Sequence, residues 1–311
     1  MSKAVNQMHI DVWKGDWGLP TIDIECLKTL TFIKFAGAPV CVNKTSNPFK
    51  TPNGALPVFR HCHTVLTSFE EVSGYLQKQN YSPDHNLSPK DCAEILAYSR
   101  LMREKLYPAL QYIWWVDERN YVDLSRPWYA KALPFPLNYY YPGQYSKRAK
   151  HLLDSLYENI EEEPAVSKMY AEAEKCLTTL AHRLGDNSYF FGNNPTSFDA
   201  IVFGYLAPLL KAPFPSCSLQ NHLKASTSLL KFVVNISKKY FPTEHKDYED
   251  ELKKQKSKAE IEFPNERRNQ IMAGIFAVIA MLGYAYSMGI IEVGFIVMSF
   301  KFKRMIFSLS R

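Results

Sequence analysis

The first eighty residues mix two hydrophobic patterns. Short apolar runs or alternation with period two, typical of strands, occur at residues 9–13, 40–42, 55–60 and 64–66. Apolar residues at helical spacing occur at 24–35, and a shorter helix is predicted at 68–79. The pattern therefore predicts one mixed domain over residues 1–80, with its elements in the order β-α-β-β-β-α.

The chain from residue 86 to residue 241 has a helical pattern. Ser88 is a good N-cap, Pro89 takes the first helical position, and Asp91 stands three residues after the cap. Prolines 134, 136 and 142 predict a loop before residue 146. We therefore expect an all-α domain over 86–241, with helices at 88–115, 123–132, 146–159, 164–184, 198–211 and 219–240.

An uncharged run near the C-terminus differs from the rest of the chain. It extends from Ile271 to Ile291, and a helix of this length, rising ~1.5 Å per residue, spans roughly 30 Å, the thickness of a bilayer's hydrocarbon core. Glu292 follows directly, and a carboxylate inside the bilayer is costly, so the span should end before it. We expect a single transmembrane helix over 271–291, a charged linker over 242–268 and a tail over 292–311.

Composition narrows the function classes. The 46% hydrophobic and 22% charged content is that of a folded protein. The net charge of +6 is small for a chain of 311 residues and does not indicate the clustered basic face of a nucleic-acid-binding protein, so we expect no nucleic-acid partner. The six cysteines are scattered without a C-x-x-C pair, which is typical of reduced structural thiols. His61, Cys62 and His63 have no second ligand pair at zinc-finger spacing, so we expect no metal site.

The predicted element order is that of a thioredoxin-like domain, and several motifs resemble the glutathione transferase superfamily, which joins such a domain to a helical one. Leu56-Pro57 matches the segment in which that superfamily places a cis proline before the third strand. Thr67-Ser68 stands where it has a Glu/Gln-Ser pair that holds the γ-glutamyl end of glutathione. The resemblance implies an α+β fold: a thioredoxin-like N-terminal domain, then an all-α transferase-like domain, then the C-terminal transmembrane helix.

The helical domain carries a matching motif. Thr196 and Asp199 resemble the superfamily's capping box, in which Thr196 caps the helix and Asp199 reaches back to the N–H of the cap. We expect this pair to begin a helix and to have no catalytic part.

Longer motifs resemble the metaxin family, and its membrane-anchored branch in particular. They are Trp17–Pro20, Phe35–Pro39, Trp128–Ala130, Pro134–Asn138, Tyr189–Gly192, Arg268–Gln270 and Gly283–Ala285. The resemblance covers residues 8–291. It implies a protein of the mitochondrial outer membrane whose body faces the cytosol. The implied partners are a second metaxin, the β-barrel sorting and assembly subunits, precursor proteins and the lipid bilayer.

The catalytic equipment of a transferase is missing from the sequence. Such an enzyme needs a hydroxyl or thiol at the end of the first strand to stabilise the thiolate, and residues 13–20 contain no Ser, Tyr or Cys. Thr21 and Cys26 are the nearest candidates, and Cys26 lies inside the following helix. We predict a non-catalytic binding scaffold with no catalytic residue and no cofactor. Its vestigial cleft is expected to consist of Trp13, Trp17, Leu56, Pro57, Thr67 and Ser68.

Two alternatives stay open at this point: a tail-anchored glutathione-dependent transferase, and an adaptor for organelle trafficking. The sequence also leaves open whether the aromatic residues between 112 and 141 form core or partner surface. The proline-bounded loop Phe135–Tyr141 is the part we expect to be exposed.

Overall fold

A four-stranded sheet forms one layer of the N-terminal part. Its strands are β1 (Met8–Val12), β2 (Val40–Lys44), β3 (Val58–His61) and β4 (Thr64–Leu66), in the order β2-β1-β3-β4. β1 pairs in parallel with β2 and antiparallel with β3, and β3 pairs antiparallel with β4. The parallel pair needs a crossover connection, and α1 (Ile24–Ala36) supplies it.

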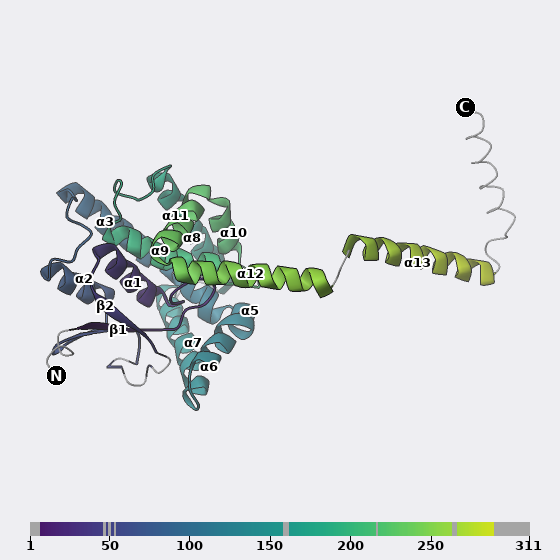
Figure 1. Cartoon of the computed structure of the whole chain (residues 1–311), viewed down its shortest axis with the longest axis horizontal. Helices are drawn as coiled ribbons and strands as arrows, with labels where there is room; N and C mark the ends of the chain where they lie inside the picture. Colours follow the sequence, from purple (N-terminus) through teal and green to yellow (C-terminus); the bar gives the residue numbers. More distant parts are fainter. Residues whose placement is uncertain are drawn as a thin grey trace. The chain divides into compact units, whose positions relative to one another are not determined.

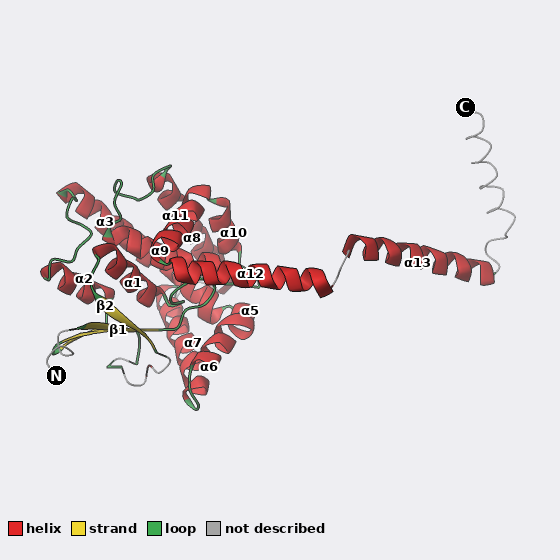
Figure 2. Ribbon diagram, in the orientation of Figure 1, coloured by secondary structure: helices red, strands yellow, loops and turns green. Residues whose placement is uncertain are grey.

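The structure is a computed structural model that describes residues 7–45, 48, 51–52, 54–157, 162–215, 217–262 and 266–288. It divides into two compact units, Met1–Glu249 and Asp250–Arg311. Figure 1 follows the chain from the sheet into the helices of the first unit, and Figure 2 shows that helices make up most of this unit.

Helices follow the sheet almost without interruption. After α2 (Phe69–Lys78) comes a long helical run with three π-helical segments, which extends from α3 (Pro89–Leu101) to α6 (Arg126–Ala132). The segments between them are η2 (Met102–Leu106), α4 (Tyr107–Gln111), η3 (Tyr112–Val116), α5 (Glu118–Asn120) and η4 (Tyr121–Ser125). The remaining helices are α7 (Leu137–Leu156), α8 (Glu162–Leu184), α9 (Ser197–Lys211), α10 (Ser218–Ala225), α11 (Thr227–Tyr240), α12 (Pro242–Glu262) and α13 (Glu266–Ser287).

Local signals explain where α1 begins and ends. Asp23 is its N-cap, and the side chain accepts a hydrogen bond from the backbone N–H of Cys26. Gly37 ends the helix in the left-handed conformation with φ of 65°, which costs a glycine little. The N-cap Asp23 and the C-terminal Gly37 therefore set the bounds of the crossover helix.

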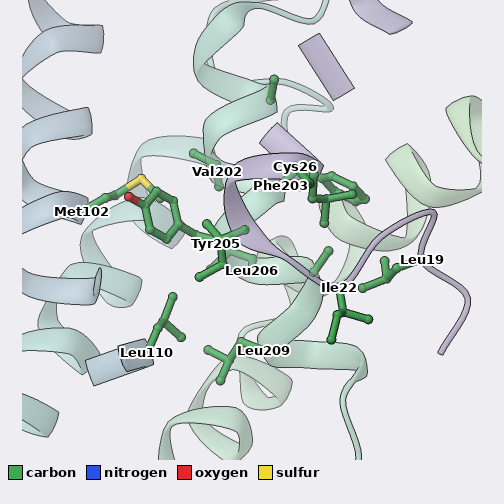
Figure 3. Close-up of a cluster of buried hydrophobic side chains, with 14 of the residues drawn as sticks. Leu19, Ile22, Cys26, Met102, Leu110, Val202, Phe203, Tyr205, Leu206 and Leu209 are labelled. Carbon is green, nitrogen blue, oxygen red and sulfur yellow. The ribbon is translucent and has the colours of Figure 1, made fainter. Parts of the chain in front are cut away.

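The core lies where α1 packs against α9. Gly204 permits their close approach, because a Cβ atom there would lie 3.0 Å from the backbone N of Lys28 and 3.2 Å from the carbonyl O of Ile24. Figure 3 shows buried side chains of α9, among them Phe203 and Leu206, in a cluster with residues of α1, the preceding loop and the π-helical run. This contact joins the thioredoxin-like part to the helical part through apolar burial.

Two predicted segments differ from the structure. The proline-rich segment before residue 146 is not a loop throughout, since α7 already begins at Leu137 and contains Pro142. A proline there removes one backbone donor, and burial of Tyr141 and Pro142 in the helical part offsets that loss. The segment 242–268, expected as an exposed linker, is helical as α12 up to Glu262.

The first turns of α12 pack on the body. His245 is buried, Glu244 pairs with Lys44 at 3.5 Å, and Tyr248 lies close enough to Gly18 that a Cβ atom there would meet it at 3.1 Å. The charge pattern that predicted a linker therefore belongs to a helix whose first residues cover the body.

The expected transmembrane helix is not found. Within the described residues, no helix is both long and apolar enough to cross a membrane, so the structure does not support the predicted span from Ile271 to Ile291. The helix concerned, α13, begins at Glu266 with charged residues and ends at Ser287, four positions before the expected end. Glycine, serine and tyrosine residues lower its apolar character further. Ile291 and the tail 292–311 lie outside the described residues.

Candidate functional site

The end of β1, where a transferase places its thiolate-stabilising group, holds a tryptophan. Trp13 follows the strand directly and is 2% exposed, and its ring packs edge-on against Tyr129 with ring centroids 5.2 Å apart. The indole therefore fills the position that a nucleophile-activating hydroxyl would need.

The two nearest hydroxyl and thiol groups are enclosed by the protein. Thr21 and Cys26 are both fully buried. Burial, with a smaller contribution from the charge of Asp23, raises the pKa of the Cys26 thiol well above its usual range. A thiol in that state is neutral at physiological pH and inert, so Cys26 is a packing residue.

Thr67 and Ser68 are occupied in a helix cap. The Ser68 hydroxyl accepts a hydrogen bond from the backbone N–H of Glu71 at 3.2 Å. The Glu71 carboxylate accepts hydrogen bonds from the backbone N–H groups of Thr67 at 3.0 Å and Ser68 at 3.3 Å, which lower the pKa of Glu71. The groups that resemble a γ-glutamyl anchor therefore stabilise the start of α2.

The loop after β1 is covered by its own chain. Asp16 joins it to the helical part, since its carboxylate accepts hydrogen bonds from Trp128 Nε1 at 2.7 Å and from the backbone N–H of Trp17 at 2.8 Å. The Trp17 ring lies 6.2 Å from that of Trp114 and 6.3 Å from that of Trp128, centroid to centroid. The apolar residues at the cleft are therefore mostly covered from within, with Trp13 and Leu19 buried and Trp17 partly buried.

A cavity of about 200 Å³ remains between the thioredoxin-like part and the helical part. It is lined by Trp13, Asp23, Ala55, Leu56, Tyr107, Gln111, Trp115, Tyr129, Tyr145 and Arg148. Of the six cleft residues expected from the sequence, Trp13 and Leu56 line it. Trp17, Pro57, Thr67 and Ser68 are not among the described residues that do. The Leu56–Pro57 peptide bond is cis, as the resemblance implied.

Asp23 and Arg148 are the two charged residues in the lining of this cavity, and sequence reasoning missed both. Burial raises the pKa of the Asp23 carboxyl from 3.8 to about 6, against the hydrogen bond from Cys26, which lowers it. The available signal was an acid directly before the first predicted helix, which indicates an N-cap and says nothing of a cavity.

Thr196 and Asp199 form a capping box at the start of α9. The Asp199 carboxylate accepts hydrogen bonds from the backbone N–H of Thr196 at 2.8 Å and from that of Phe190 at 2.9 Å. Thr196 Oγ1 donates to the same carboxylate at 2.6 Å. This pair stabilises the start of α9, and neither residue is among those that line the cavity.

Comparison with solved structures bears on the fold. A β-etherase from Sphingobium, LigF, superposes with a TM-score of 0.51 at 13% identity, covering 79% of this chain and 99% of that one. A glutathione transferase of Ceriporiopsis subvermispora, solved with glutathione, gives 0.51 at 14% identity over 75% of this chain and 97% of that one. The predicted α+β architecture, a thioredoxin-like sheet followed by a helical transferase-like domain, is confirmed.

Comparison with sequences is more specific. Residues 26–146 match the Tom37 family, described as outer mitochondrial membrane transport complex protein, and residues 173–236 match the glutathione S-transferase C-terminal domain. Human metaxin-1 is 39% identical over 298 residues, which are 94% of this chain and 64% of the human protein. Metaxin-1 of Macaca fascicularis is 40% identical over 92% of both chains, and metaxin-3 of Danio rerio 40% identical over 74% of both. The chain belongs to the metaxin family.

Proposed function

We propose that this chain is a non-catalytic binding subunit in protein transport at the mitochondrial outer membrane. Its relatives are metaxins, and the family that matches residues 26–146 is described as part of an outer-membrane transport complex. Both findings point to that membrane and to protein transport. The finer part of the proposal is a scaffold of the β-barrel sorting and assembly machinery, with the body on the cytosolic face.

The proposal that the chain is not a catalyst rests on the residues of the cleft. Buried Trp13 takes the place of an activating hydroxyl, Cys26 is enclosed with a raised pKa, and Ser68 is engaged in a helix cap. The fold is that of a transferase, but a fold does not carry its chemistry with it. We therefore assign the body to binding.

The partner surface that we propose is an aromatic tip formed by Phe135, in the turn after α6, and by Tyr139 and Tyr140, at the start of α7. Phe135, Tyr139 and Tyr140 are 81%, 75% and 60% exposed, whereas Trp114 and Trp115 are buried. The turn that carries the tip projects at the lower edge of the first unit in Figure 2. Exposed aromatic residues close together are typical of binding hot spots. The aromatic residues between 112 and 141 thus divide into core and candidate surface.

The proposal assigns the chain to two domains. Residues 1–80 form the thioredoxin-like domain and residues 86–241 the all-α domain, with the tip in the latter. The expected partners are a second metaxin, β-barrel sorting and assembly subunits, and precursor proteins in transit.

The experiment tests the tip directly. The full chain and a variant with Phe135→Ser, Tyr139→Ser and Tyr140→Ser are compared for co-purification of a second metaxin from solubilised mitochondria. A control variant carries Leu96→Ser and Val122→Ser, which remove apolar side chains that are 67% and 51% exposed elsewhere. We expect the tip variant to lose at least about tenfold in bound partner, or ~1.4 kcal/mol, with unchanged circular dichroism. Equal recovery with all three proteins would refute this assignment of the surface.

A further inference from the structure

The cavity beside Trp13 has a lining that metaxin membership does not explain. Five aromatic side chains surround an acid, and four of their ring pairs lie in direct contact. The centroid distances are 5.2 Å for Trp13–Tyr129, 4.9 Å for Trp115–Tyr129, 5.1 Å for Trp115–Tyr145 and 5.8 Å for Tyr129–Tyr145. Tyr107 completes the wall. Ring faces attract cations, and aromatic walls of this kind recognise ammonium groups.

The acid in this wall is Asp23. Its Oδ1 accepts a hydrogen bond from the backbone N–H of Cys26 at 2.9 Å, but in the described part of the chain no Lys, Arg or His forms an ion pair with it. Burial first, and then the charge of Asp23, raise the pKa of Tyr129 and Tyr145, which line the same cavity. The charge of Lys28 acts on Asp23, but Lys28 forms its ion pair with Glu25. A buried carboxylate that has no ion pair of its own is costly, and a cation in the cavity would relieve that cost.

A positively charged residue, Arg148, also lines the cavity. Arg148 lines it from α7 and is exposed, while Asp23 is partly buried at the start of α1. A lone cation would meet Asp23 favourably and Arg148 unfavourably. A ligand that carries an ammonium group and an anionic group would satisfy both residues, with its anion on the guanidinium.

The size of the cavity limits the ligand. A volume of about 200 Å³ holds about six waters at ~30 Å³ each, and it is below the ~300 Å³ at which pockets for drug-sized ligands begin. A tripeptide such as glutathione exceeds it, and a headgroup-sized molecule fits.

We propose that this cavity binds a small ammonium zwitterion of the phosphocholine type, with the ammonium group among the rings beside Asp23 and the anionic group on Arg148. The same chemistry is offered by free phosphocholine and by the headgroup of phosphatidylcholine.

The test uses the full chain and its tryptophan fluorescence, because Trp13 and Trp115 line the cavity. We expect a saturable change with phosphocholine. Asp23→Asn keeps an N-cap residue, so α1 stays intact, and should weaken the binding of both phosphocholine and choline about tenfold or more. Arg148→Ala should weaken phosphocholine about as much, and it should leave choline bound at least as tightly, because the guanidinium repels a lone cation. Lys147→Ala removes an exposed neighbouring cation that does not line the cavity and should change neither.

Vesicles separate the two sources of the ligand. Cosedimentation with phosphatidylcholine but not phosphatidylglycerol vesicles, lost in Asp23→Asn, assigns the lipid headgroup. Saturable binding of free phosphocholine without such cosedimentation assigns the soluble molecule. The proposal is overturned if no saturable signal appears up to about 10 mM phosphocholine, or if Asp23→Asn binds as tightly as the unmodified chain. Tyr145→Leu is the second variant: it removes one ring from the wall, leaves the carboxylate in place, and should weaken choline binding severalfold.

Discussion

Two carboxylates, Asp23 and Asp199, accept hydrogen bonds from backbone N–H groups at the starts of helices. Asp199 is fully buried and accepts three hydrogen bonds, from the backbone N–H groups of Phe190 and Thr196 and from the hydroxyl of Thr196. In Asp199→Asn, an amide NH₂ group would face at least one of these donors. We expect the free energy of unfolding to fall by about 1–3 kcal/mol, measured by urea denaturation. The matched control is Asp91→Asn in the exposed box of α3, which should cost clearly less, and equal losses at both sites would contradict the argument.

Asp23 predicts a pH dependence with a definite sign. Its folded pKa of about 6 lies above its ordinary value of 3.8, so the folded chain binds this proton more tightly than the unfolded chain does. The unfavourable contribution of this residue is therefore absent below about pH 4, grows from about pH 4 to about pH 6 and is complete above that. The charged and titratable groups around it are Glu25 and Lys28 of α1, Cys26, Tyr107, Tyr129, Tyr145 and Arg148.

The measurement compares Asp23→Asn with the unmodified chain by urea denaturation at pH 4, 5, 6 and 7. Because asparagine also caps a helix, the two proteins should have similar stability at pH 4. The variant should become relatively more stable as the pH rises to 7. A difference that stays constant across this range would show that folding does not raise the pKa of Asp23.

At the scale of elements, the contact of α1 with α9 depends on Gly204. In Gly204→Ala the new methyl group would press on the backbone of Lys28 and Ile24, which are held inside a helix and cannot yield easily. Overpacking of this kind costs about 1–3 kcal/mol, and we expect a lower midpoint in thermal or urea unfolding. Gly74→Ala in α2 is the control, since nothing lies within 4 Å of its added Cβ, and it should stabilise by about 0.5–1 kcal/mol. A stabilising Gly204→Ala would refute the close approach.

The same scale shows what the sequence predicted and what it did not. The capping boxes of α3 and α9 and the four strands were predictable, because each depends on residues within a few positions of one another. The start of α7 was not, because Pro142 is tolerated through packing of distant residues. The cavity was not predictable either, since its side chains come from the segments before α1 and β3 and from α4, η3, α6 and α7, and no local pattern reports that meeting. The membrane span was predicted from hydropathy alone, and the helix found there is bounded differently.

For the molecule as a whole, the decisive question is whether a transferase fold with this cleft still takes glutathione. Glutathione carries two carboxylates and one ammonium group, and an enzyme holds it through free polar groups along the thioredoxin-like domain. Here Ser68 is committed to a cap, and the cavity offers one cation, Arg148, opposite the acid Asp23. The charges and the volume both disfavour the tripeptide.

We therefore expect no saturable binding of glutathione to the full chain at millimolar concentration, by calorimetry or tryptophan fluorescence, with an active glutathione transferase as the positive control. A dissociation constant below about 1 mM, equivalent to ~4 kcal/mol, together with conjugation activity lost in Ser68→Ala, would restore the enzymatic alternative. Because glutathione and phosphocholine are titrated into the same protein, the two results are separable. Binding of phosphocholine alone leaves the non-catalytic assignment intact, whereas binding of glutathione removes it whatever the aromatic cavity holds.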